Sequence, residues 1–277
     1  MRVIHRIPIF VTLASLACST PRQNPPPSAT TDATANHRPG DDRAITGDAA
    51  PSQPGRAVPG AATLAVPMDE YFPLRQGASW IYRGRAAWVE GEGEKAVDKN
   101  GEVSIQMEVL EVIEKKHVTA YVVQGFPGDL VGYAGGPIKP TRRVIIRVGT
   151  GSYYLGNDEA LACIKGDVDE LAKVEPEELF LDVPLAVGKV FGMIESLARP
   201  DGLYGWLVLE EKQTPASDIR GIADGTPLHT FTLKFETSPD GTLVDFVPGV
   251  GITSYSFLHK GTTDELDVTL VEYHPGR

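Results

Sequence analysis

Period-two alternation of apolar and polar residues constrains the fold of this chain more than any other feature. Trp80, Tyr82, Gly84, Ala86 and Trp88 occupy every second position of one stretch. Successive side chains of a β-strand point to opposite faces, so these residues share one face of an extended strand. Aromatic and β-branched residues become frequent from about residue 68, and the alternation begins at Ser79. It predicts a β domain rather than a helical one.

The same alternation returns along the chain. Val103, Ile105 and Met107 alternate with polar residues, and the phase slips near Val109-Leu110, which predicts a β-bulge. In the strand from Arg142 to Val148 the pattern places Val144, Ile146 and Val148 inward, with Arg143 and Arg147 outward. Between His229 and Glu236 it predicts one buried face, containing Phe231 and Leu233, and one wet face.

Glycine- and proline-containing turns separate these strands. The segments Glu90–Lys95 and Asp98–Gly101 read as turns, and Asn100-Gly101 is a strong hairpin signal. Roughly ten strands with short connections predict an antiparallel all-β domain, a sandwich or a half-barrel. One segment differs: residues 158–178 are acidic and lack aromatic residues, which predicts a small helical or irregular insertion at the surface.

The N-terminus has the features of an export signal. Arg2 and Arg6 precede an apolar run from Ile7 to Ala17, which is shorter than the roughly 20 residues needed to cross a bilayer. Residues 1–17 are therefore predicted to be a signal peptide. Cys18 follows this run directly. One interpretation is that the protein is secreted in the ordinary way and that the Cys18 thiol has no role.

A low-complexity segment follows. Residues 18–66 are rich in proline, alanine and threonine and contain no aromatic residue. Such a segment cannot bury enough apolar surface to offset its ordering entropy, so we expect a disordered tether. The β domain is then predicted to span residues 67–277.

Few residues point to chemistry. The net charge of −11 argues against nucleic acid as a partner. Cys163 is interpreted as a small core residue, and the scattered His117, His229, His259 and His274 form no zinc-binding pattern. Asp167, Asp169 and Glu170 could face calcium, but an EF-hand glycine is missing. We predict no catalytic, cofactor or metal site, and no enzyme activity.

A short sequence motif occurs twice in the chain. Phe72-Pro-Leu-Arg-Gln-Gly-Ala-Ser-Trp80 and Val183-Pro-Leu-Ala-Val-Gly-Lys-Val-Phe191 both read apolar-Pro-Leu-x-x-Gly-x-x-aromatic. Either an ancient duplication or a reused way of starting a strand explains this pattern, and we favour the second.

Several motifs together carry a family resemblance. The stretch Leu-Ala-Ser-Leu-Ala-Cys18 resembles a bacterial lipobox, and Tyr71 to Tyr82 resembles the opening of domains in a group of uncharacterised bacterial lipoproteins. Val183–Phe191, Pro248–Gly251 and Leu270–Tyr273 match that group's later elements. The resemblance implies lipidation of Cys18. It also implies a single antiparallel, strongly curved sheet, an open barrel or half-barrel similar to the half-barrels of periplasmic lipoprotein carriers. Ser19, in place of an aspartate, implies the outer membrane.

These inferences define the expected function. We expect a cell-envelope protein, attached to the membrane through Cys18, whose β domain binds an apolar ligand or a protein partner. The alternatives are a structural or assembly accessory of the envelope without a ligand, and a hydrolase with a site built from scattered residues.

Overall fold

Strands paired antiparallel in chain order organise the domain. The computed structural model describes residues 66–68, 70–166, 178–193, 203–260 and 264–277. Its strands are β1 (Ser79–Glu90), β2 (Val97–Glu114), β3 (Val118–Gln124), β4 (Arg142–Val148), β5 (Ser152–Gly156), β6 (Leu179–Asp182), β7 (Val190–Phe191), β8 (Trp206–Pro215), β9 (Pro227–Glu236), β10 (Asp240–Val247), β11 (Gly251–His259) and β12 (Glu265–His274). They form one 12-stranded sheet, which confirms the predicted single antiparallel sheet. The short strands β6 and β7 are the two strands beyond the ten that the sequence predicts.

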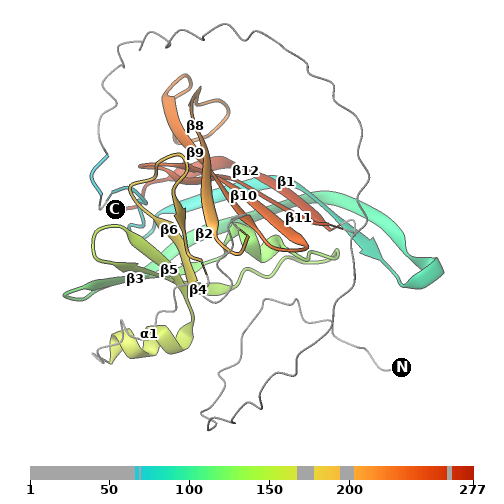
Figure 1. Ribbon diagram of the computed structural model, residues 1–277, viewed down its shortest axis with the longest axis horizontal. Coiled ribbons are helices and arrows are strands. Elements are labelled where there is room, and N and C mark those ends of the chain that lie inside the picture. The colour runs from blue at the N-terminus through green and yellow to red at the C-terminus, as the bar shows by residue number, and fades with distance from the viewer. Residues whose placement is uncertain (1–65, 69, 167–177, 194–202, 261–263) are drawn as a thin grey trace, which may run out of the picture. The chain divides into compact units, whose positions relative to one another are not determined.

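The sheet curves until its two end strands meet. The strand order is β6-β5-β4-β3-β2-β1-β12-β11-β10-β9-β8-β7, so the first and last strands of the chain are neighbours in the middle (Figure 1). At the ends, Gly192 approaches β6 so closely that a Cβ there would lie 2.2 Å from the carbonyl oxygen of Leu179. The predicted strong curvature is therefore confirmed.

Bulges contribute to this curvature. Register shifts occur in five strand pairs, and each adds local twist. One falls between Val109 and Glu111 in the β2–β3 pair, where the phase slip in the sequence predicts it. The predicted inward residues of β9, Phe231 and Leu233, are also confirmed as core residues.

The predicted facing of β4 is wrong. Val144 and Ile146 lie on the outer face of the sheet, and Ile145 joins the main core instead. The helix α1 (Asp158–Lys165) covers that outer face with Leu161 and Ile164, so the face is apolar as well. With both faces buried, alternation cannot identify which one points inward.

The predicted turn at Asp98–Gly101 is also wrong, because these residues lie within β2. The chain reverses earlier, at residues 91–96, through a short 3-10 helix at Gly93–Lys95. Gly101 lies beneath the indole of Trp88: a Cβ at this glycine would be 3.4 Å from the ring. The aromatic ring covers the glycine, a known way of stabilising a glycine inside a strand.

The helix α1 confirms the helical part of the predicted insertion. Asn157 caps its N-terminus by accepting a hydrogen bond from the Ala160 N–H at 2.9 Å. No helix in the described ranges is both long and apolar enough to cross a membrane. The predicted signal peptide, Cys18 and the tether up to residue 65 lie outside the described residues, as do Asp167, Asp169 and Glu170.

Candidate functional site

The space enclosed by the curved sheet is filled by the chain's own aromatic side chains. Phe72 is 1% exposed and stands at the centre of this core. Its ring lies 5.4–6.3 Å from four others, which belong to Trp80, Tyr153, Phe180 and Phe246. These rings come from β1, β5, β6 and β10, so Phe72 joins strands from both halves of the sheet. Within the described residues, these side chains form a packed core inside the sheet.

Two buried aromatic side chains of β1 donate hydrogen bonds to main-chain carbonyl oxygens. The indole N–H of Trp80 donates to the carbonyl oxygen of Val250 at 2.7 Å, and the hydroxyl of Tyr82 donates to that of Ile252 at 3.0 Å. Burial raises the pKa of Tyr82 well above its usual value and raises the pKa of Tyr255 to about 12. These phenols stay protonated at neutral pH, so they anchor the core and are not poised as bases.

A glycine permits the close packing around Phe72. Gly251 has φ +102°, and a Cβ there would lie 2.7 Å from the ring of Phe72. Only glycine tolerates both the backbone conformation and this approach. The Pro248–Gly251 corner recognised in the sequence therefore has a packing role.

The two Pro-Leu-x-x-Gly stretches meet in space. The N–H of Leu185 donates to the hydroxyl oxygen of Tyr71 at 3.4 Å, and the Tyr71 ring stacks on Phe246 at 5.9 Å. Tyr71 directly precedes the first stretch, which leads into β1 in the middle of the strand order, whereas the second stretch connects the end strands β6 and β7. Neither stretch brings a reactive group to the contact.

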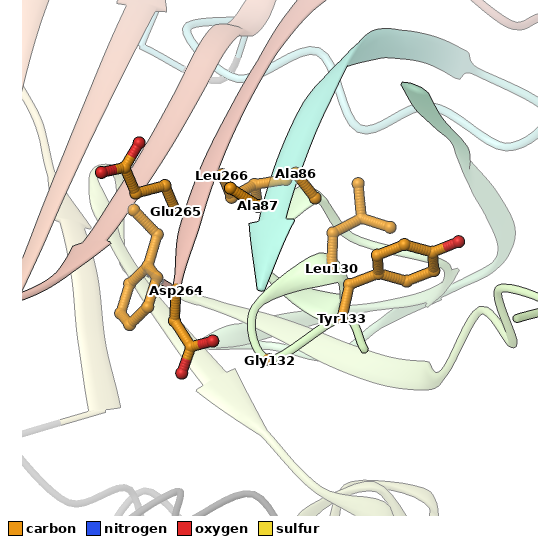
Figure 2. A pocket seen from close by; sticks show the side chains of 9 residues that line it. Ala86, Ala87, Leu130, Gly132, Tyr133, Asp264, Glu265 and Leu266 are labelled. Carbon is orange, nitrogen blue, oxygen red and sulfur yellow. The ribbon is translucent and has the colours of Figure 1, made fainter. Parts of the chain in front are cut away.

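One depression of the described surface is small and shallow. Its space measures about 190 Å³, part of which is open solvent. In Figure 2 it lies between Leu130 and Tyr133 on one side and Asp264 and Glu265 on the other. Sites for drug-sized ligands occupy about 300–1,000 Å³ and enclose most of the ligand. The depression does not reach that size.

Asp129 holds the long loop between β3 and β4. Its carboxylate is 1% exposed, and Arg143 Nη2 lies 2.7 Å from its Oδ1. It also accepts hydrogen bonds from the Phe126 N–H at 3.1 Å, the Thr141 N–H at 2.9 Å and the Thr141 hydroxyl at 2.6 Å. Sequence reasoning missed this residue. Its only signal is a lone aspartate in a Gly-Phe-Pro-Gly-Asp loop.

The described histidines His229, His259 and His274 do not converge. His229 contacts Glu211 at 2.6 Å, His259 contacts Asp240 at 2.5 Å, and His274 contacts Glu272 at 2.8 Å, each in a separate pair. Among the described residues, no group of three or more His, Cys, Asp or Glu could hold a metal ion. Cys163 lies half-buried in α1.

The outer face of the sheet differs between its two halves. Over β3, β4 and β5 it is covered by α1. Over β7, β8, β10 and β11 it carries large aliphatic side chains that remain 41–55% exposed. These residues, named here the outer aliphatic patch, are Val187, Val190, Leu209, Leu243 and Leu258. Lys234 of β9 pairs with Leu243, so polar side chains stand between the aliphatic residues of β8 and those of β10.

Two solved structures are similar to this chain. One is a Bacteroides fragilis protein described as exported and as having a YmcC-like fold, with 10% identity, coverage of 76% of this chain and 100% of the other, and a TM-score of 0.38. The second, from Parabacteroides distasonis, is described as a lipoprotein, with 10% identity, the same coverages and a TM-score of 0.32. No protein-family model and no curated protein matches the chain. Similarity at this level assigns neither a family nor a function.

Proposed function

We propose that this is a lipid-anchored protein of the cell envelope whose β domain docks a protein partner. The anchor rests on the apolar run that ends at Ala17-Cys18, and Ser19 favours the outer membrane. A lipidated cysteine carrying more than one acyl chain would hold the domain stably at the membrane.

The packed interior is the reason why we favour a protein partner over an apolar ligand. An apolar ligand needs an enclosed space, and here Phe72 and the rings around it occupy that space. The outer aliphatic patch supports a protein partner, because the described chain leaves it uncovered. A structural accessory of the envelope remains the alternative, and a non-enzymatic role stays part of the proposal.

Site-specific photo-crosslinking in the native envelope tests the docking proposal. A photoreactive amino acid at Leu243 should give one discrete protein adduct. The matched control is Leu110, which is equally exposed at 43% but lies on β2, away from the patch. Equal labelling at both positions would contradict docking at the patch. A lipid copurifying one-to-one with the protein would instead favour the expectation that the β domain binds an apolar ligand.

Membrane fractionation tests the anchor. The Cys18→Ser variant should leave the membrane fraction, while Cys163→Ser should stay there. If the Cys18→Ser variant remains membrane-bound, the protein is not held by a lipid on that cysteine.

A further inference from the structure

The loop between β3 and β4 is tied together at its two ends. Residues 126–140 follow Gly125, whose N–H donates to the carbonyl oxygen of Thr141 at 2.7 Å. The side-chain amide of Gln124 donates to the carbonyl oxygen of Pro140 at 2.6 Å. A compact loop whose ends lie close together is an Ω-loop, a class that is frequently functional. Residues 126–140, named here the cap loop, therefore stand on a narrow stem.

The hydrogen bonds of the cap loop stay within the loop and its stem. The N–H groups of Asp129, Val131 and Tyr133 donate to carbonyl oxygens three residues earlier, at 2.8–3.2 Å. The carboxylate of Asp129 accepts from Thr141, just before β4. Among the described residues, no hydrogen bond joins the cap loop to β1, β2, β11 or β12.

Apolar side chains hold the cap loop against the rest of the sheet. Phe126 and Leu130 are buried, and the Phe126 ring lies 6.3 Å from the ring of Tyr255 in β11. The ring of Tyr133 stands edge-on to the indole of Trp88 in β1, at 5.2 Å and 82°. Attraction between apolar groups is not directional, so these contacts can separate without breaking a hydrogen bond.

A gap marks the boundary between the cap loop and the sheet. The depression of about 190 Å³ is lined by Leu130 and Tyr133 on the side of the loop, and by Ala86, Phe257 and Leu266 on the side of the sheet (Figure 2). Ala86 and Leu266 are buried there, as part of the core. Well-packed interiors leave few voids, so the loop and the sheet are less tightly interlocked here than the core around Phe72.

One ion pair fastens the cap loop to its stem. The Asp129 carboxylate is 1% exposed, but its partner Arg143 in β4 is 24% exposed. The guanidinium of Arg143 also lies 5.9 Å from the centre of the Phe126 ring, so Arg143 contacts the loop twice. If the loop moved outward, water would replace the lost hydrogen bonds of both charged groups, which makes release less costly than leaving them buried and unpaired.

We propose that the cap loop is a hinged element, which moves off the end of the sheet as one unit when Asp129 releases Thr141 and Arg143. The hydrogen bonds inside the loop would persist, and the stem at Gly125, which has φ +75°, would absorb the change in backbone angles. The open state would expose the apolar inner face around Leu266, which the closed state keeps from water and from other chains. This inference goes beyond the docking function and does not depend on it.

Amide hydrogen exchange on the purified full chain tests the proposal without any substitution. The amides of Asp129, Val131 and Tyr133 should have protection factors within about threefold of one another, because one opening exposes all three. Their protection should be at least about 100-fold below that of the Tyr255 and Val268 amides in the sheet. Low urea should speed exchange of the strand amides and leave the loop amides almost unchanged, because opening the loop exposes little surface.

A pair of variants tests the role of Asp129. Asp129→Asn should speed exchange at Val131 and Tyr133 by at least about tenfold beyond any change at Val268, because it removes the charge from the hydrogen bonds to the stem. Leu161→Ala in α1 is the matched control, since it destabilises the domain elsewhere. It should speed exchange at Val268 and leave the loop amides unchanged.

A neutral dye gives a second measure of the open state. N-phenyl-1-naphthylamine fluoresces more strongly in apolar surroundings, and it should gain more fluorescence with Asp129→Asn than with the parent or with Leu161→Ala. Three results would overturn the proposal: loop amides with unrelated protection factors, loop amides that exchange only together with the strands, and loop exchange that Asp129→Asn leaves unchanged.

Discussion

Replacing Phe72 by alanine tests most directly whether the interior is a packed core. The side chain is 1% exposed, and truncating such a phenylalanine costs about 3–5 kcal/mol through lost transfer free energy and the cavity left behind. Three of its ring partners stand edge-on, at interplanar angles of 65–83°. Such pairs contribute about 0.5–1.5 kcal/mol each beyond their buried area, which favours the upper end, about 4–5 kcal/mol.

Urea denaturation of the full chain measures this loss. The midpoint should fall with the slope m unchanged, and Tm should drop by about 10–20 °C for a domain of this size. The matched control is Val187→Ala, a change at a side chain that is 55% exposed, which should stay within about 0.5 kcal/mol of the parent.

The new cavity supplies a second readout. An apolar cavity left by a large side chain stays dry and binds small aromatic molecules such as benzene. Benzene should therefore raise the Tm of the Phe72→Ala variant and leave that of the parent unchanged. A loss below about 2 kcal/mol, or equal stabilisation of both proteins by benzene, would refute the view that Phe72 fills the interior.

Three further predictions concern other parts of the domain. Asp129→Ala should lower the free energy of unfolding, measured by urea denaturation, by about 3–5 kcal/mol. The change removes the carboxylate beside Arg143 and leaves two main-chain N–H groups without their acceptor. Asp129→Asn should lower it less. Leu161→Ala in α1 should cost about 2–4 kcal/mol, and faster limited proteolysis of the helix should accompany it. Burial raises the pKa of Tyr121 to about 12, above the value of about 10 in an unfolded chain. Its contribution to stability is therefore complete below about pH 10 and is lost as the pH rises toward 12, so Tyr121→Phe should flatten the fall in urea midpoint over that range.

The sequence predicted fold class well because the signal is local. In β1, alternating residues face a core on one side and solvent on the other, so Trp80, Tyr82 and Ala86 could be assigned to the core directly. In β4 the alternation failed to identify the inner face, because α1 buries the outer face as well. Val144 and Ile146 are therefore apolar although they point away from the main core. The sequence of β4 alone does not show that a helix packs on its outer face.

The candidate sites were less accessible from sequence. The unpaired edge of β2 is a property of pairing: β3 pairs with β2 only as far as Glu108↔Gln124, and nothing within Asn100–Ser104 indicates that. The Asn100-Gly101 pair even pointed to a turn there. The role of Asp129 was equally hard to predict. Asp129 lies in the loop after β3 and its partner Arg143 lies in β4, so the two meet only when the loop is folded.

The neighbouring positions of β1 and β12 affect how the domain can be made. The N–H of Arg277 donates to the carbonyl oxygen of Gln76 at 3.3 Å, and the sheet continues from β1 directly to the last strand. On the proposed export route, β1 would cross the membrane before β12. Until β12 arrives, the edge of β1 that pairs with it would have no partner strand. Contacts so distant in sequence form slowly, because loop closure precedes them. Synthesis and translocation must therefore finish before this sheet can be completed, and until then β1 needs protection from pairing with other chains.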